Sequence, residues 1–402
     1  MSNDSRPRPA AFDRRFLRRF TADWGPLPIV LALIVLWIIF WLANDKFLSP
    51  LNLTNLMLQI AALGTLATGI VLVLLLGELD LSAAMVSGLG AAIMSSLNVR
   101  NGLPGPLALL AGIGVGTLIG LFQGIWITKL RIPSFIVTLA GFIAWQGALL
   151  WMVGNTGSIS LRDPFILGIA GTFFTEVWIG LTLGAVLVAG YAFFLFLDRR
   201  RQLRANLSAP APRALLLRVA LIAAIILAAL AAFYANRGLP LAVVIFIGLV
   251  IVVDGVTRRT IYGRHIYAVG GNAEAARRAG IQVDRIRISI FALASTIASV
   301  AGILAASRLS AVNLASGSSD LLLNAIAAAI IGGASLFGGR GSAWSGLLGA
   351  LVIGSISNGT DLLAYDVSSR TLTSLKFFIT AIVLLATVTI EVVSRRRRET
   401  AG

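Results

Sequence analysis

The sequence contains no cysteine and only one histidine, His265, among its 402 residues. The absence of cysteine excludes disulfides, thiol nucleophiles and zinc fingers, and one histidine cannot build a histidine-rich metal site. Charged residues are also scarce, at 12% against the roughly 25% typical of soluble domains. Since hydrophobic residues make up 57% and the mean hydropathy is +0.90, the sequence predicts an integral membrane protein without a metal.

Motifs for catalysis and nucleotide binding are missing as well. The phosphate-loop pattern GxxxxGK[ST] is absent, so we expect the chain itself to bind no ATP and no other cofactor. Its seventeen acids lie mostly in loops, which argues against a membrane enzyme acting on lipid or lipid-linked sugar. One glycine-rich stretch predicts a tight turn between helices, and its glycines are Gly332, Gly333, Gly338, Gly339 and Gly341.

Long apolar runs predict the fold class. A membrane-spanning helix needs about 20 mostly apolar residues. The candidate runs are 27–43, 56–77, 81–98, 106–127, 133–153, 177–197, 215–234, 239–257, 288–307, 321–338, 342–360 and 372–393. We predict an all-α, polytopic bundle of about twelve transmembrane helices; ten spans with short re-entrant pieces is the alternative.

The distribution of charge predicts the orientation. With a cytoplasmic N-terminus and alternating spans, 26 of the 33 basic residues fall inside and 7 fall outside. This bias follows the positive-inside rule and places both termini in the cytoplasm. Since the net charge of +16 is spread over short loops rather than one folded face, we expect no nucleic-acid partner.

Charge and proline divide the chain into parts. An Arg-containing stretch with alternating Ala and Pro predicts a cytoplasmic linker between two sets of six spans. The predicted parts are an Arg-rich cytoplasmic tail (1–26), a first transmembrane half (27–197), the linker (198–214), a second half (215–394) with a cytoplasmic loop (258–287), and a cytoplasmic tail (395–402).

Glycines recur every four residues in the fourth predicted span and therefore share one face of its helix. Such a stripe lets helix backbones approach closely. We interpret it as a packing surface, and a glycine-lined path for a substrate is the alternative. The four residues are Gly112, Gly116, Gly120 and Gly124.

One polar island, residues 263–280, lies between apolar runs and is called the polar segment below. Asn272 suits a helix N-cap, Ala273 to Ala279 are mostly good helix formers, and Gly280 suits the position after a C-terminus. A helix of about seven residues is marginal alone in water, so it needs a surface to pack against. That surface is either the protein's own bundle or a cleft in a cytoplasmic partner.

Two acids interrupt the apolar sequence in GELDLS, residues 77–82. An ionised carboxylate at mid-bilayer costs on the order of 2.5–3.5 kcal/mol. Glu78 and Asp80 must therefore lie at the water boundary, in a cavity or at a broken helix near Gly77. The segment is either a solvated turn in which Asp80 and Ser82 cap the third span, a pore or gate, or a proton-coupling site.

Further polar and aromatic side chains lie inside the predicted spans. Amides and aromatic faces bind sugars, although interhelical hydrogen bonding is their more frequent use. These residues include Gln59, Gln123, Gln146, Phe135, Trp145 and Trp344. The candidate pore or gate residues are Glu78, Asp80, Ser82, Asn324 and Asn358.

Four stretches together resemble the permease subunits of bacterial ABC importers for monosaccharides, the ribose/xylose/galactose group. RHIYAVGGNAEAARRAGI (264–281) resembles the family's cytoplasmic loop and GELDLS its acidic break. IPSFIVTLAG (132–141) resembles its fifth-span opening, and AIIGGASLFGGRGS (329–342) its glycine-rich segment. The matches occur in order over most of residues 50–395, and extra apolar sequence around 198–235 favours the D-xylose permeases within the family.

The resemblance implies a non-catalytic subunit of the bacterial inner membrane that moves a sugar by alternating access. Two copies would form the pore, a cytoplasmic ATPase carrying ATP and Mg²⁺ would grip the loop helix of each, and an extracytoplasmic sugar-binding protein would deliver xylose or a related sugar. By position in the motif, the ATPase-coupling residues would be Gly271, Asn272, Glu274, Ala275, Ala276, Arg277, Arg278 and Gly280.

One departure from the family pattern concerns the pore. Relatives often read ELDAIAA where this chain reads LLNAIAA, so that Leu322 and Asn324 replace two acids and Asp320 is out of register. Pore chemistry assigned to those acids is therefore in doubt here. The competing function is a proton-coupled secondary sugar transporter that uses Glu78 or Asp80, against which stands the small number of intramembrane charges.

Overall fold

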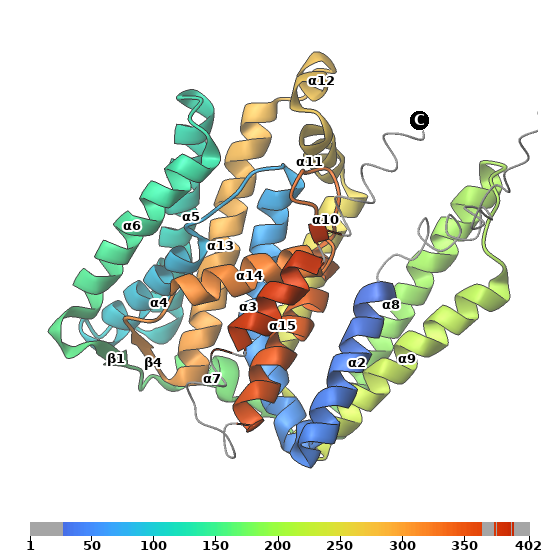
Figure 1. Ribbon diagram of the computed structural model, residues 1–402, viewed down its shortest axis with the longest axis horizontal. Coiled ribbons are helices and arrows are strands. Elements are labelled where there is room, and N and C mark those ends of the chain that lie inside the picture. Colours follow the sequence, from blue (N-terminus) through green and yellow to red (C-terminus); the bar gives the residue numbers. More distant parts are fainter. Residues whose placement is uncertain (1–26, 364–373, 375, 387, 390–402) are drawn as a thin grey trace, which may run out of the picture.

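Helices dominate the computed structural model, which confirms the predicted all-α class (Figure 1). The residues that the structure describes are 27–363, 374, 376–386 and 388–389. The predicted tails 1–26 and 395–402 lie outside the described residues, as does part of the last predicted span, 372–393.

Eight helices of the described chain are long and apolar enough to cross a membrane, so the protein is polytopic. They are α3 (Pro50–Leu75), α5 (Gly105–Lys129), α6 (Ser134–Val153), α8 (Val177–Arg204), α9 (Pro212–Tyr234), α10 (Leu241–Arg259), α13 (Val283–Leu309) and α15 (Ala343–Leu363). Shorter apolar helices are α2 (Leu27–Ala43), α4 (Ala83–Val99), α14 (Ser319–Ile331) and Lys376–Ala386. Each covers one of the predicted runs, while the count of twelve spans stays a prediction.

The helix α14 corrects one of the predicted spans. The expected helix over 321–338 ends at Ile331, and a loop with positive φ at Gly333, Gly338, Gly339 and Gly341 follows it. Thirteen residues rise only about 20 Å, which is less than the roughly 30 Å of hydrocarbon. The apolar run is longer than the helix because glycine, alanine and Leu336 keep the loop hydrophobic.

The core lies around α3 and α13. α13 packs against α3, α4 and α5, and α15 packs against α3 and α14. Small residues permit these close contacts, since a methyl group added at Gly302 of α13 would overlap the Ser87 carbonyl of α4. Local sequence signals set the helix starts: Ser49 caps α3 by accepting from the Asn52 N–H at 3.3 Å, and Pro50 occupies the first turn.

Connecting loops gather at the two ends of the bundle. At one end, β1 (Ser158–Ser160) pairs with β4 (Ala311–Asn313), and β2 (Phe173–Phe174) pairs with β3 (Leu239–Pro240). At the other end lie α11 (Ile261–Gly271) and α12 (Ala273–Arg278), seen at the top of Figure 1. Loops that the alternating orientation assigns to one side therefore contact each other.

Residues 154–176, between the predicted spans 133–153 and 177–197, hold α7 (Pro164–Gly171) between η2 (Gly154–Thr156) and β2. Ile166 of α7 is fully buried, and the Ala170 N–H donates to the Ser307 hydroxyl of α13 at 2.9 Å. The segment therefore closes this end of the bundle. At the same end, η1 (Asp45–Leu48) joins α2 to α3 (Figure 1).

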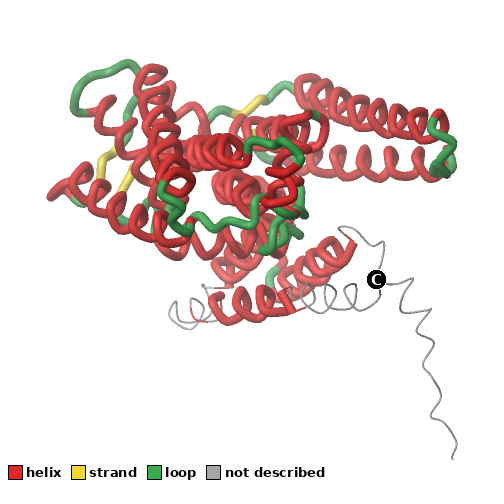
Figure 2. The backbone as a smooth tube through the Cα atoms, turned by 90° about the horizontal axis from the view of Figure 1, so that it is seen from above, coloured by secondary structure: helices red, strands yellow, loops and turns green. Residues whose placement is uncertain are grey.

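The helices α8 and α9 form a hairpin that stands to one side of the bundle (Figures 1 and 2). They pack chiefly on each other, where Gly180 and Gly184 of α8 meet Tyr234, Ile226 and Leu230 of α9. The predicted linker between the two halves is the short turn at the tip of this hairpin and the helix ends beside it.

Candidate functional site

The polar segment forms two capped helices. Thr260 caps α11 by accepting from the Gly263 N–H at 3.0 Å. Asn272 caps α12 by accepting from the Ala275 N–H at 2.9 Å, and Gly280, with φ of +85°, follows its end. The short helix lies where the sequence predicts it. Sequence reasoning missed α11, although Thr260 and the three-residue spacing of Ile266 and Val269 are signals for it.

The exposed face of α12 carries charge. Glu274 accepts from Arg277 at 3.0 Å and from Arg278 at 3.4 Å, and all three side chains are more than half exposed. Of the residues that the family motif assigns to coupling, Gly271, Asn272, Ala275 and Gly280 are also exposed. Ala276 is the exception, because it is buried and its carbonyl accepts from the Ile281 N–H at 3.0 Å. The helix therefore packs against the protein's own bundle through Ala276 and exposes its charged face to solvent.

The polar segment, the end of α3 and the glycine-rich loop 332–342 meet at one junction. The Gly339 N–H donates to the Leu75 carbonyl at 2.9 Å, and the Tyr267 hydroxyl donates to the Gly341 carbonyl at 2.9 Å. A methyl group added at Gly270 would overlap the Leu75 carbonyl. The glycine-rich loop is thus a tight turn, as predicted. Because Gly270 of α11 lies against the Leu75 carbonyl, α11 cannot shift without moving the end of α3.

The acidic break is a bend between α3 and α4, with Gly77 at φ of +72°. Glu78 forms an ion pair with Arg287 of α13, with Oε1 and Nη2 3.0 Å apart, and both side chains are largely buried. The break is therefore tied to the helix that follows the polar segment. Arg287 is a partner that sequence reasoning missed.

Asp80 lies inside the bundle rather than at a solvated turn. Its Oδ1 accepts from the Ser82 N–H at 2.8 Å and from the Ser82 hydroxyl at 2.7 Å. Burial raises the pKa of the Asp80 carboxyl, and the hydrogen bonds from Ser82 oppose that rise. The idea that Ser82 caps the third span through its side chain is wrong, since its hydroxyl turns to Asp80 and Gln123.

The helix α6 holds the acidic break from the other side. The Thr138 hydroxyl accepts from the Leu81 N–H at 3.1 Å. A methyl group added at Gly141 would overlap the Gln123 amide and lie 3.0 Å from the indole nitrogen of Trp145. Glu78, Asp80, Ser82 and parts of α5 and α6 are thus brought together in one buried polar region.

The other two pore candidates are asparagines of α15 and α14. Asn358 of α15 is buried and exchanges two hydrogen bonds with Asn52 of α3, at 2.8 and 3.0 Å. Asn324 lies half-buried on α14.

The glycine stripe of α5 lies against α4 and α13. A methyl group added at Gly112 would be 2.6 Å from the Gly90 carbonyl of α4, and one added at Gly124 would be 2.8 Å from the Ile288 Cα of α13.

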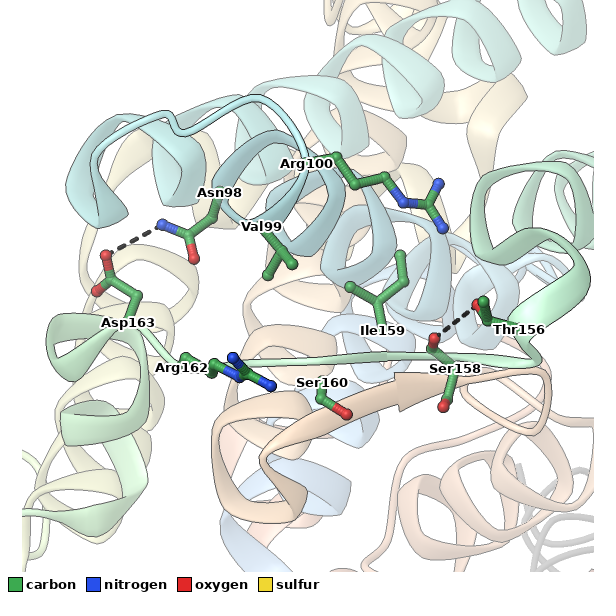
Figure 3. Close-up of a pocket in the computed structure, with 9 residues that line it drawn as sticks. All are labelled: Asn98, Val99, Arg100, Thr156, Ser158, Ile159, Ser160, Arg162 and Asp163. Atoms are coloured by element: carbon green, nitrogen blue, oxygen red, sulfur yellow. Dashed lines mark hydrogen bonds between the residues drawn. The ribbon is translucent and has the colours of Figure 1, made fainter.

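A cavity of about 670 Å³ opens at the end opposite the polar segment (Figure 3). Asn98 donates to the Asp163 carboxylate at 3.0 Å on one side, and Arg100 donates to the Met152 carbonyl at 2.7 Å on the other. Desolvation opposes ionisation of Asp163, but backbone N–H groups of α7 and the Asn98 amide outweigh it and lower its pKa. Arg162, exposed at the rim, has no acidic partner within the described part of the chain.

Comparison with known proteins gives a consistent family. Residues 52–388 match the family described as "Branched-chain amino acid transport system / permease component". The xylose transport system permease protein XylH of Haemophilus influenzae is 34% identical over 336 residues, which cover 83% of this chain and 89% of the relative. XylH of Escherichia coli K12 is 34% identical over 370 residues, covering 92% of both chains. The ribose import permease protein RbsC of Bacillus subtilis is 29% identical and covers 83% and 84%. No solved structure matches the chain.

Proposed function

Since the chain belongs to the permease family of the branched-chain amino acid transport system type, we propose that it is the membrane-spanning subunit of an ATP-driven monosaccharide importer. The observation that carries the proposal is the similarity to permeases of sugar transport over 83–92% of the chain. Xylose is the proposed substrate, because two of the relatives compared are named as xylose permeases. The subunit itself is not a catalyst and resides in the inner membrane.

The proposed partner at the polar segment is a cytoplasmic ATPase. The face of α12 that carries Glu274, Arg277 and Arg278 is exposed, while Ala276 fixes the helix to the bundle. A charged, anchored helix of this kind suits a cleft in a soluble partner. The polar-segment end then faces the cytoplasm, and the charge bias favours both termini on that same side.

A path for coupling runs from α12 into the bundle. Movement of α11 would act on the end of α3 through the Gly270 and Gly339 contacts, and movement of α13 would act on the acidic break through Arg287 and Glu78. Both contacts converge where α3 gives way to α4. The buried polar region around Asp80 is the proposed gate, which opens by alternating access when two copies of the chain rock against each other.

The end with the 670 Å³ cavity is the proposed docking face for an extracytoplasmic sugar-binding protein. Delivery by such a protein explains how the permease transports without a tight sugar site of its own. The ion pair of Glu78 with Arg287 does not favour the alternative of a proton-coupled transporter, since it occupies one of the two carboxylates that could carry a proton.

Glu274→Arg tests the docking role. The substitution removes both ion pairs of α12 and places three like charges within two turns, so we expect co-purification of the ATPase and ATP-dependent uptake to fall at least tenfold while membrane insertion is retained. Glu176→Arg, the same exchange at an exposed position of the opposite end, is the matched control. Equal ATPase co-purification by the two variants would reject the proposal.

A further inference from the structure

The hairpin α8–α9 has few contacts with the bundle. Within the described residues it is attached by the packing of α9 on α3, by the β2–β3 pairing, by a small apolar cluster that includes Leu230, Phe233 and Val243, and by one stacked arginine. Only Gly180 and Gly184 of the 28 residues of α8 are buried. The two helices of the hairpin therefore leave most of their surface open to lipid.

Arginines concentrate at the tip of the hairpin, and two more end α10, on the side of the polar segment. We call this set the hairpin basic cluster: Arg199, Arg200, Arg201, Arg204, Arg213, Arg218, Arg258 and Arg259. Only two acids accompany it. Asp198 lies 3.9 Å from Arg201, and Asp254 lies 3.0 Å from Arg258. Arg200, Arg204, Arg213 and Arg218 have no acidic partner in the part of the chain that the structure describes.

The same helices expose apolar side chains within one to two turns of these arginines. Phe193 of α8, Leu217 of α9 and Val252 of α10 are 60%, 72% and 64% exposed. Arg259 joins the two elements, with its guanidinium carbon 3.2 Å from the centre of the Phe194 ring. Cations that adjoin open apolar helix faces fit a ligand with an anionic head and hydrocarbon tails.

We propose that the hairpin basic cluster binds an anionic phospholipid, with its phosphate among the arginines and its acyl chains along the exposed faces of α8, α9 and α10. A lipid is favoured over free phosphate because the arginines border apolar surface rather than a closed polar pocket. The assignment of the lipid to the cytoplasmic leaflet rests on the proposed function.

The site bears on coupling because of where α10 ends. Arg259 is its last residue, and the next residue, Thr260, is the N-cap of α11 in the polar segment. A lipid that holds the hairpin against Arg259 also fixes the start of the segment proposed to receive the ATPase. The hairpin then acts as a lipid-dependent brace for that segment.

The test titrates phosphatidylglycerol into the delipidated full chain in a zwitterionic detergent and counts bound lipid by native mass spectrometry, with phosphatidylcholine as the reference. We expect tighter binding of phosphatidylglycerol. Since each arginine near an anionic headgroup is worth roughly a fivefold gain, Arg204→Gln/Arg213→Gln should weaken that binding about 30-fold. Lys129→Gln/Arg131→Gln removes two exposed charges at the same end, away from the hairpin. This control should change the affinity for phosphatidylglycerol less than about threefold.

Several outcomes would overturn the inference. Equal affinity for the two lipids, or equal losses in both double variants, would mean that only diffuse charge acts there. Displacement of the lipid by millimolar inorganic phosphate would mean a simple anion site. Should Arg204→Gln/Arg213→Gln not fold, Arg200→Gln/Arg218→Gln removes two other unpaired members of the cluster.

The lipid titration contains neither sugar nor ATPase, so its result stands apart from the proposed function. Lipid selectivity together with a failure of Glu274→Arg to affect the ATPase would leave the lipid site in place and remove the proposed transporter role. Loss of lipid selectivity with a strong effect of Glu274→Arg would do the reverse.

Discussion

The central helix α3 and the hairpin helix α8 are similarly apolar, yet they differ in what surrounds them. In the most apolar stretch of α3, 78% of the residues are buried, against 11% in α8. α3 carries Gly64, Thr65, Thr68 and Gly69 on its packed surface, whereas the outer surface of α8 is made of large side chains such as Phe193. Hydrophobicity thus directs both helices into the membrane, and small residues decide which one is packed inside the bundle.

The polar contacts of the two regions differ in the same way. The bundle contains the buried Asn52–Asn358 pair and the largely buried Glu78–Arg287 pair. The hairpin end has the exposed Arg201–Asp198 pair at 3.9 Å, and Arg200, Arg204, Arg213 and Arg218 are exposed there as well. A close-packed interior makes each of its contacts costly to change, while the hairpin leaves room for a ligand.

Glycine substitutions test this difference most severely. A methyl group at Gly302 of α13 would overlap the Ser87 backbone of α4, which cannot move by a change of rotamer. We expect Gly302→Ala to lower the free energy of unfolding by about 3 kcal/mol or more, or to prevent recovery of monodisperse protein. A methyl group added at Gly190 of α8 has no atom within 4 Å. Gly190→Ala should therefore change the free energy of unfolding by less than about 0.5 kcal/mol.

Thermal unfolding of the two purified variants in detergent measures the difference. Equal melting temperatures would contradict the view that close backbone packing stabilises the bundle and is absent from the outer face of the hairpin.

The ion pairs provide a second, smaller contrast. Arg287→Ala leaves Glu78, whose side chain is 15% exposed, without its partner, and we expect a loss of about 1–3 kcal/mol in the free energy of unfolding. Arg201→Ala breaks the exposed hairpin pair and should cost less than about 0.5 kcal/mol. A double-mutant cycle with Glu78→Ala isolates the first pair, and zero coupling energy in that cycle would show that the two groups act independently.

The sequence predicted the helices well because apolar runs of spanning length are set by local composition. Each of the eight helices of spanning length lies on a predicted run, and the α12 cap at Asn272 follows from residues adjacent in sequence. The error at α14 has a physical reason: hydropathy does not separate an apolar helix from an apolar glycine loop. The end at Ile331 is signalled by Gly332 and Gly333, which the sequence assigns to a turn, rather than by hydropathy.

The site was predictable only in part. Glu78 and Asp80 stand out because ionisable groups are rare in apolar sequence, but the pairing of Glu78 with Arg287 depends on how α13 packs and has no local signal. Asn358 is a pore candidate as an intramembrane amide, and that role stays a prediction. Its partner Asn52 had no local signal, because the pairing of two buried amides depends on which helices face each other.

The stacking of Arg259 on Phe194 is the weakest of the contrasts and the one that joins the two regions. Phe194→Leu keeps an apolar side chain but removes the ring, so we expect a loss of about 0.5–1 kcal/mol, seen as two- to fivefold faster hydrogen exchange of the α11 amides that follow Arg259. Phe196→Leu, a neighbouring ring on α8 without a stacked arginine in the described structure, is the control. Identical exchange in the two variants would mean that the hairpin does not restrain the polar segment. Faster exchange in Phe194→Leu alone requires that the restraint pass through the stacked guanidinium of Arg259.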